Sequence, residues 1–203
     1  IPGEREAEMI YKGVRQSVQL DEQPVMILDI GGGSNEFIIG NKNKIFWKHS
    51  FNLGMARTLE LFPLSDPISK KETREVEKYF EKELEDLYSA VNELKPSIMI
   101  GASGSFETFA SLLSHSLPGK YPASLNKPSR IIDLNDYYEL HEKLLASTIE
   151  ERNSMPGMEP VRVEMIILAT IFVNFILKKC EIKTLVQSDY ALKEGVIAEM
   201  LNL

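Results

Sequence analysis

Three consecutive glycines, Gly31–Gly33, follow an apolar run in the stretch VMILDIGGGSNEFIIG, and this order constrains the fold more than any other feature. The apolar run predicts a buried strand that carries Asp29 near its end. Because glycine lacks a Cβ, successive backbone N–H groups can point into one concavity that suits a phosphate. A carboxylate beside such amides would repel an anion unless Mg²⁺ lies between them. We therefore expect Gly31, Gly32, Gly33 and Ser34 to bind phosphate and Asp29 to contact Mg²⁺.

Two more predicted strands end in small or acidic residues. GASGS, residues 101–105, follows a short apolar strand and begins a helix, and Ser188 and Asp189 follow the last strand. The carboxyl ends of strands in open α/β sheets generally line the ligand site, so the three segments can share one cleft. The additional phosphate-binding candidates are Gly101, Ser103, Gly104 and Ser105. Each segment alone could be no more than a turn or a helix N-cap, and a lone glycine triplet is more often a tight turn, here capped by Asp29. Only the repetition of the three segments favours a ligand site.

The order of the predicted elements is typical of a ribonuclease-H-like α/β fold. A helix near residues 3–14 precedes strands at 25–30, 36–39 and 44–51, which turn residues connect as an antiparallel meander. The further elements are one long amphipathic helix that begins with a capping box at Ser69 and Glu72 and runs to Lys95, a strand and a helix around GASGS, a loop at 117–130, helices near 136–146 and 147–153, an apolar helix at 161–179, a strand at 183–189 and a closing helix.

These elements predict one domain, residues 1–203, with a mixed five-stranded sheet and helices on both faces. A doubly wound Rossmann fold would require a helix after the first strand. Neither GxxxxGK[ST] nor GxGxxG followed by a helix occurs.

Charge and composition narrow the set of partners. A net charge of −7 argues against binding nucleic acid through a broad basic face. The most apolar segment, residues 165–177, is shorter than the roughly 18 residues that a membrane span needs. The N-terminus lacks a signal-peptide pattern, and Cys180 is the only cysteine. We expect a cytoplasmic protein with no nucleic acid or membrane partner, and a homodimer stays open.

LDIGGGSNEFIIG resembles the second phosphate-binding segment of the actin, sugar kinase and heat-shock chaperone superfamily. Within that superfamily the chain closely resembles the exopolyphosphatase and guanosine pentaphosphate phosphohydrolase family. Five further segments agree with the family in order: GEREAEMIYKGV, SFNLGMAR, GASGSFET, MPGMEPVRVE and QSDYALKEGV. The resemblance covers essentially the whole chain and implies an actin-like ATPase domain.

The resemblance implies a phosphohydrolase that removes the terminal phosphate from inorganic polyphosphate or guanosine pentaphosphate with Mg²⁺. It assigns to Glu6 the role of the base that activates water, although an acid in such a helix is ordinarily a solvated surface residue. Arg57 and Arg162 are candidate clamps for a phosphate or a carboxylate, with surface or structural ion pairs as the alternative, and Glu36 is a further candidate. The histidines and Cys180 show no metal-ligand or nucleophile pattern.

The sequence departs from the family at several points. Pro2, Arg5 and Asn35 stand where the family usually has Ser, an acid and Thr. The family also has an N-terminal half with a DxGS segment, which these 203 residues lack, so we expect the chain to correspond to the second domain of a two-domain core and to act with an N-terminal domain. Two alternatives stay open: a phosphate-binding or nucleotide-binding regulatory module without turnover, and an ATPase or kinase of the same superfamily.

Overall fold

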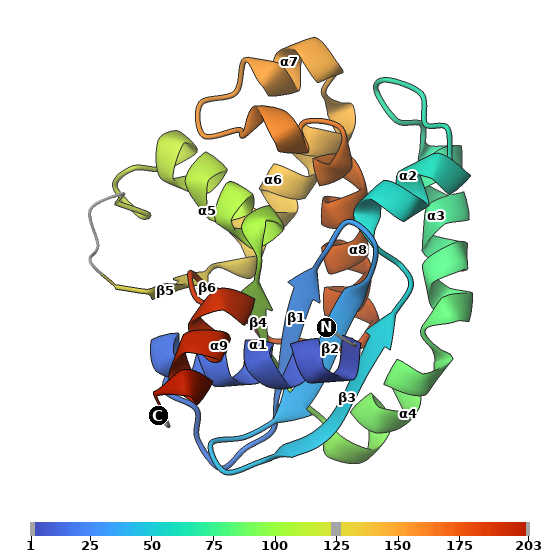
Figure 1. Cartoon of the computed structure of the whole chain (residues 1–203). Helices are drawn as coiled ribbons and strands as arrows, with labels where there is room; N and C mark the ends of the chain where they lie inside the picture. Colours follow the sequence, from blue (N-terminus) through green and yellow to red (C-terminus); the bar gives the residue numbers. More distant parts are fainter. Residues whose placement is uncertain (1–2, 123–126, 202–203) are drawn as a thin grey trace.

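The computed structural model describes residues 3–122 and 127–201, which form a six-stranded mixed sheet with helices on both faces (Figure 1). The strands follow the order β3-β2-β1-β4-β6-β5 across the sheet. Strands β1, β4 and β6 are parallel neighbours, whereas β2, β3 and β5 join the sheet through antiparallel pairs. The strand bounds are β1 Val25–Ile30, β2 Asn35–Gly40, β3 Ile45–Phe51, β4 Ile98–Ala102, β5 Ser129–Ile132 and β6 Thr184–Ser188. The predicted α/β class, the meander and the helices on both faces are therefore confirmed.

Strand β5 corrects two predictions, that of five strands and that of a loop extending through Arg130. It has four residues and, among the described residues, pairs only with β6 at the edge of the sheet. A strand this short has too few residues for an alternating pattern, and its pairing partner lies more than fifty residues away in sequence. Part of the predicted loop, residues 123–126, lies outside the described residues.

The helices are α1 Gly3–Ser17, α2 Met55–Leu61, α3 Lys70–Glu83, α4 Glu85–Leu94, α5 Gly104–Ser116, α6 Leu134–Ala146, α7 Ile149–Asn153, α8 Met165–Lys179 and α9 Leu192–Met200, with a 3₁₀ turn at Pro160–Arg162. The single long helix predicted through Lys95 is wrong, because α3 and α4 meet at the buried Leu84, whose φ is −106° and ψ is 21°. No glycine or proline marks this break in the sequence. The predicted helix at 161–179 likewise begins as the 3₁₀ turn.

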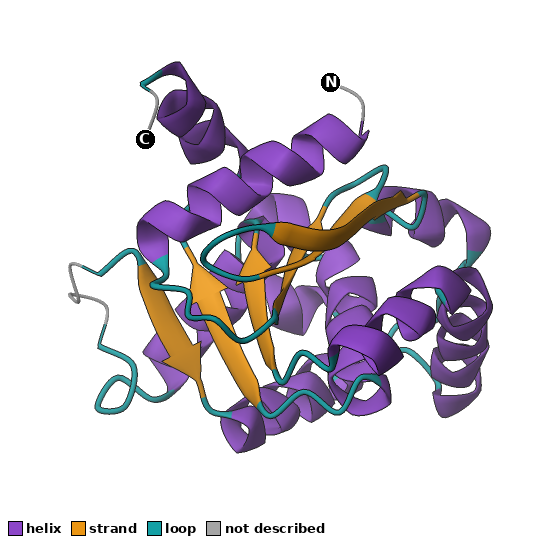
Figure 2. Ribbon diagram, turned by 90° about the horizontal axis from the view of Figure 1, so that it is seen from below, coloured by secondary structure: helices purple, strands orange, loops and turns teal. Residues whose placement is uncertain are grey.

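Apolar layers cover both faces of the sheet. The larger layer packs α8 and its neighbouring helices against the face that carries Leu28, Phe37 and Met99. The smaller layer packs α1 against the opposite face, which carries Ile27 and Ile38. Figure 2 shows the N-terminal and C-terminal helices together on this second face. Within the described part of the chain, no helix has both the length and the apolar character that a membrane crossing requires.

Two glycines allow α1 and α9 to cross at close backbone distance. A Cβ on Gly13 would lie 2.0 Å from the carbonyl oxygen of Ala191, and a Cβ on Gly195 would lie 1.7 Å from that of Met9. Glu199 of α9 also binds Lys12 of α1, with 2.6 Å between Nζ and Oε1. This crossing fixes α1 on the sheet and thereby determines where its N-terminal residues lie.

We predict that Gly13→Ala lowers the free energy of unfolding by about 1–3 kcal/mol, because the added methyl group forces α1 and α9 apart. Alanine has the higher helix propensity by about 1 kcal/mol, but a 2.0 Å contact with backbone cannot be relieved by a side-chain rotation. Urea unfolding measures the change. Gly119→Ala is the control, since no atom lies within 4 Å of its Cβ position. Equal stability of the two variants would contradict the close backbone contact between α1 and α9 at Gly13.

Candidate active site

The parallel strands bring three predicted site segments to one edge of the sheet. Leu28 of β1 pairs with Gly101 of β4, and Ala102 of β4 pairs with Ser188 of β6. The loops that follow β1 and β4 are also hydrogen-bonded, because the Ile30 N–H donates to Ser103 Oγ at 3.3 Å. The glycine loop, residues Gly31–Ser34, therefore lies beside the start of α5.

The start of α2 binds the carbonyl groups of the glycine loop. Met55 N–H donates to Gly31 O at 2.9 Å, Ala56 N–H to Gly32 O at 3.0 Å, and Gly54 N–H to Gly33 O at 3.3 Å. Gly54 permits this approach, since a Cβ there would lie 2.3 Å from the backbone of Gly32 and Gly33.

The carbonyl groups of Gly31, Gly32 and Gly33 are thus turned toward protein. The Gly31 N–H donates to Ser34 O at 3.0 Å within the loop, and the three amides that follow are left for a ligand. In the described part of the chain, the amides of Gly32, Gly33 and Ser34 have no hydrogen-bond acceptor, and Gly32 and Gly33 are exposed. Consecutive free amides of this kind form an anion-binding surface.

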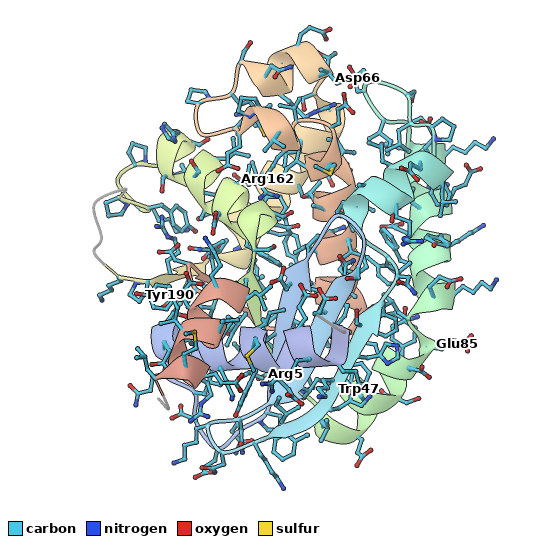
Figure 3. The ribbon with its side chains drawn as sticks, viewed as in Figure 1. Arg5, Trp47, Asp66, Glu85, Arg162 and Tyr190 are labelled. Atoms are coloured by element: carbon cyan, nitrogen blue, oxygen red, sulfur yellow. The ribbon has the colours of Figure 1, made fainter. Side chains whose placement is uncertain are left out.

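Positive charge lies on both sides of these amides. The exposed Arg57 donates from Nε to Gly33 O at 3.2 Å, which places its guanidinium at the glycine loop. Arg162 packs against the first residue of α5 so closely that a Cβ on Gly104 would lie 1.6 Å from its Nη2 (Figure 3). Within residues 3–122 and 127–201, the N-cap residue Ser103 makes no side-chain capping bond, and the amides of Gly104 and of the buried Ser105 have no hydrogen-bond acceptor, at a helix end that favours anions.

Three carboxylates lie on the α1 side of the same edge. Asp29 and Glu36 are directly opposite each other in the β1–β2 pair, on the sheet face that α1 covers. Glu6 lies one turn before Ile10 on the stripe of α1 that packs against the sheet. Glu36 is 2% exposed, and its Oε1 accepts from Ser34 Oγ at 2.6 Å and Ser50 Oγ at 2.7 Å. The glycine loop and the acidic group are therefore joined through Ser34.

Burial first, and the neighbouring carboxylates second, raise the pKa of two of these carboxyl groups. Burial is the main cause of a pKa of Asp29 well above its usual value, and Glu36, Glu6 and Glu107 raise it further while Arg162 opposes them. The residue Asp29 keeps some solvent-accessible surface, but protein atoms closely surround its carboxyl group. Burial and the charge of Glu36 likewise raise the pKa of Glu6.

A bound cation would relieve the repulsion among these carboxylates. The residues present supply only some of the ligands that such a cation needs. Among residues 3–122 and 127–201, no three His, Cys, Asp or Glu side chains are arranged to hold a metal ion by themselves. Mg²⁺ is commonly held by one or two carboxylates together with substrate phosphates and water, and Asp29 beside the free amides suits that mode.

The end of β6, where Ser188 and Asp189 lie, offers fewer free groups to a ligand than the ends of β1 and β4. Ser188 is 1% exposed, and its hydroxyl exchanges hydrogen bonds with Ser17 Oγ and with the backbone of Tyr190. The exposed Asp189 accepts a hydrogen bond from Gln187 Nε2 at 2.7 Å. The hydroxyl of Ser188 is thus satisfied by local partners. Asp189 instead adds negative charge near Glu107. Burial and the charge of Glu159 are the larger causes of the raised pKa of Glu107, and Asp189 raises it further.

Ser50 and Glu107 also belong to the group around Asp29 and Glu36, although the sequence did not predict either of them. Ser50 is far from Glu36 in sequence and meets it only through the β2–β3 register. Glu107 lies in the first turn of α5, where acidic residues are common for reasons of helix stability alone.

The whole chain, residues 1–203, matches the model of the Ppx/GppA phosphatase family. The chain belongs to this family. Among solved structures, an exopolyphosphatase from Cytophaga hutchinsonii matches 98% of the chain and 64% of its own length, with a TM-score of 0.93 and 38% identity. The Aquifex aeolicus Ppx/GppA structure shows the same fold, with a TM-score of 0.81 at 24% identity over 98% of this chain and 62% of that one. The fold is thus the actin-like, ribonuclease-H-like one that the sequence predicted.

Curated relatives agree at lower identity. Exopolyphosphatase 2 of Mycobacterium tuberculosis is 26% identical over 82% of this chain and 51% of its own length. The chain spans little more than half the length of the curated exopolyphosphatase relatives that it matches.

Two departures from the family motifs have structural partners. Arg5 forms ion pairs with Glu8 of its own helix and with Glu199 of α9. Asn35 is fully buried, and its Nδ2 donates to Leu53 O at 2.8 Å, which connects β2 to the segment before α2. Pro2 lies outside the described residues.

We predict that Asp29→Asn stabilises the protein at pH 8. Because the pKa of Asp29 is raised, the native state binds its proton more tightly than the unfolded chain does, and ionised Asp29 costs stability above that pKa. Each unit of pKa shift corresponds to about 1.4 kcal/mol. The gain in the free energy of unfolding that Asp29→Asn gives over the unmodified protein should shrink as the pH falls through the raised pKa of Asp29. It should disappear near pH 4, about the ordinary pKa of an aspartate.

Urea unfolding at several pH values tests this prediction. Asp21→Asn, at an exposed position in the segment before β1, serves as the control and should change stability little. A lower stability of Asp29→Asn at pH 8 would mean that the ionised carboxylate is stabilised by its surroundings.

Proposed function

We propose that this chain provides half of the active site of a phosphohydrolase that removes the terminal phosphate from inorganic polyphosphate or guanosine pentaphosphate. The observation that carries the proposal is the group of free amides at Gly32, Gly33 and Ser34 beside the crowded carboxylates Asp29 and Glu6. Membership of the Ppx/GppA phosphatase family supports the reaction class. The named exopolyphosphatase relatives support polyphosphate as a substrate.

Binding of the substrate is assigned to the loops and the arginines. Non-bridging phosphate oxygens accept hydrogen bonds from the glycine loop and from the start of α5, and Arg57 and Arg162 add charge on the two sides. Phosphoryl transfer requires mainly positioning and charge stabilisation from the protein, which suits amides and guanidinium groups. Asp29 would hold Mg²⁺, which neutralises charge on the phosphate oxygens.

Glu6 is assigned as the general base. Its raised pKa brings the carboxyl group closer to the operating range of a base near neutral pH. Its side chain forms no hydrogen bond or ion pair within the described residues, so its oxygens are available to a water molecule. The crossing of α1 with α9 holds it in place, while Glu36 raises its pKa and is itself fixed by two serine hydroxyls.

The second half of the site is proposed to come from an N-terminal domain of the family type. Amides and charges on one side of a phosphate leave its other side open to water, where electrostatic stabilisation is weak. The length of the family relatives, of which this chain spans little more than half, supports a two-domain core.

We predict that Glu6→Gln lowers kcat by about 10²-fold or more and leaves KM nearly unchanged, since it removes the base and keeps the size of the side chain. Steady-state phosphate release from polyphosphate with Mg²⁺ measures both constants in residues 1–203 joined to the N-terminal half of the Cytophaga hutchinsonii exopolyphosphatase, because the chain alone is expected to release little phosphate. Glu8→Gln is the matched control on α1, because Glu8 binds Lys48 at 2.6 Å and lies outside the acidic group. An equal loss in both variants, or a rise in KM that accounts for the whole effect, would exclude Glu6 as the base.

We predict that residues 1–203 alone fold and bind inorganic tripolyphosphate but release little phosphate. Residues 1–203 joined to the N-terminal half of the Cytophaga hutchinsonii exopolyphosphatase should be active on polyphosphate, on guanosine pentaphosphate, or on both. Comparable rates from the chain and the chimera would overturn the half-site proposal. Tripolyphosphate binding without turnover in either protein would instead favour a regulatory module.

A further inference from the structure

Arg152 is a buried arginine that lies outside the group of strand ends. It belongs to α7, is 3% exposed, and donates hydrogen bonds to three separate segments. Its Nη1 binds the carbonyl of Ser147 at the end of α6, its Nε binds Val163 O at 3.0 Å, and its Nη2 binds Asp66 Oδ1 at 3.0 Å. A buried charge is tolerated when its donors are satisfied in this way, and removal of one partner is then strongly disruptive.

The bond to Val163 connects Arg152 to the candidate site. Val163 directly follows Arg162 and is itself buried. The preceding 3₁₀ turn, Pro160–Arg162, has only three residues, so its position depends on the groups that hold its ends. Arg152 therefore fixes the backbone from which Arg162 reaches the start of α5.

The bond to Asp66 connects Arg152 to the other side of the site. Asp66 lies in the segment that follows α2, and its Oδ2 also accepts from Ile149 N–H at 2.7 Å (Figure 3). Helix α2 is the element whose first amides bind the carbonyl groups of the glycine loop. The Arg152–Asp66 pair thus joins the segment after α2 to the segment that carries Arg162.

We propose that Arg152 is a positioning residue that holds Arg162 at a fixed separation from the glycine loop, so that both contact one polyphosphate chain. This inference rests on the proposed function of that site. Arginine suits the role because its planar group presents donors in fixed directions to three acceptors, whereas lysine has a single flexible ammonium group.

A double-mutant cycle with Arg162 separates positioning from general stability. Arg152→Met is made in the unmodified protein and in Arg162→Ala, and the affinity for inorganic tripolyphosphate with Mg²⁺ is measured by calorimetry. We expect Arg152→Met to weaken binding about tenfold when Arg162 is present and less than twofold when it is absent, because residues that act through each other are not additive. The melting temperature should fall similarly in both backgrounds.

Hydrogen exchange supplies a readout that is independent of ligand. Arg152→Met should speed amide exchange in residues 159–163, and Leu87→Ala should not. Leu87 is a fully buried residue of α4, so its truncation lowers stability without touching this network and should leave tripolyphosphate binding unchanged. If Arg152→Met does not fold, Asp66→Asn serves as the milder variant, since it keeps an acceptor and removes the charge.

The outcomes are distinct. Unchanged exchange in residues 159–163, or an equal loss of affinity with and without Arg162, would overturn the positioning role. Failure of the unmodified protein to bind tripolyphosphate would overturn the proposed function and the positioning role that rests on it. The exchange data would then still show whether Arg152 holds the segment.

Discussion

The hydrogen bonds between the start of α2 and the carbonyl groups of Gly31–Gly33 are the contact on which the rest of the site depends. They turn the carbonyl oxygens of the glycine loop away from the ligand side and leave three consecutive amides without a partner within the described residues. The same contact fixes Arg57, whose Nε binds Gly33 O. A loop of glycines without this support could adopt many conformations, and binding a phosphate would then carry the full entropic cost of ordering it.

Beside these amides the protein concentrates negative charge at a cost to its own stability. Asp29, Glu36 and Glu6 come from three elements, and the two antiparallel neighbours β1 and β2 place two of them directly opposite each other. Like charges in such a position destabilise a sheet, which is consistent with the raised pKa of Asp29. Proteins commonly retain such strain at functional sites, and the proposed Mg²⁺ is the partner that would relieve it.

Local patterns predicted most of the elements. The glycine loop, the meander and the helix after GASGS follow from apolar runs bounded by turn residues, and the capping box at Ser69 is present in the structure. The predictions failed where distant contacts decide the outcome. The short strand β5 exists because it pairs with β6, and α3 ends at Leu84 without any residue that would break a helix.

The sequence by itself determined the family, the fold class and the strand ends, because each depends on residue types at short spacings that the chain carries locally. It also supplied Glu6 and Asp29 as candidates, through the motifs in which they occur. Only the tertiary structure decided that Glu36 is held by Ser34 and Ser50, that Glu107 belongs to the same charged group, and that Arg162 rests on Gly104. Apart from the bond between Ser34 and Glu36, those relations join residues that are separated in the chain. Strand register and helix packing set them, and a local pattern encodes neither.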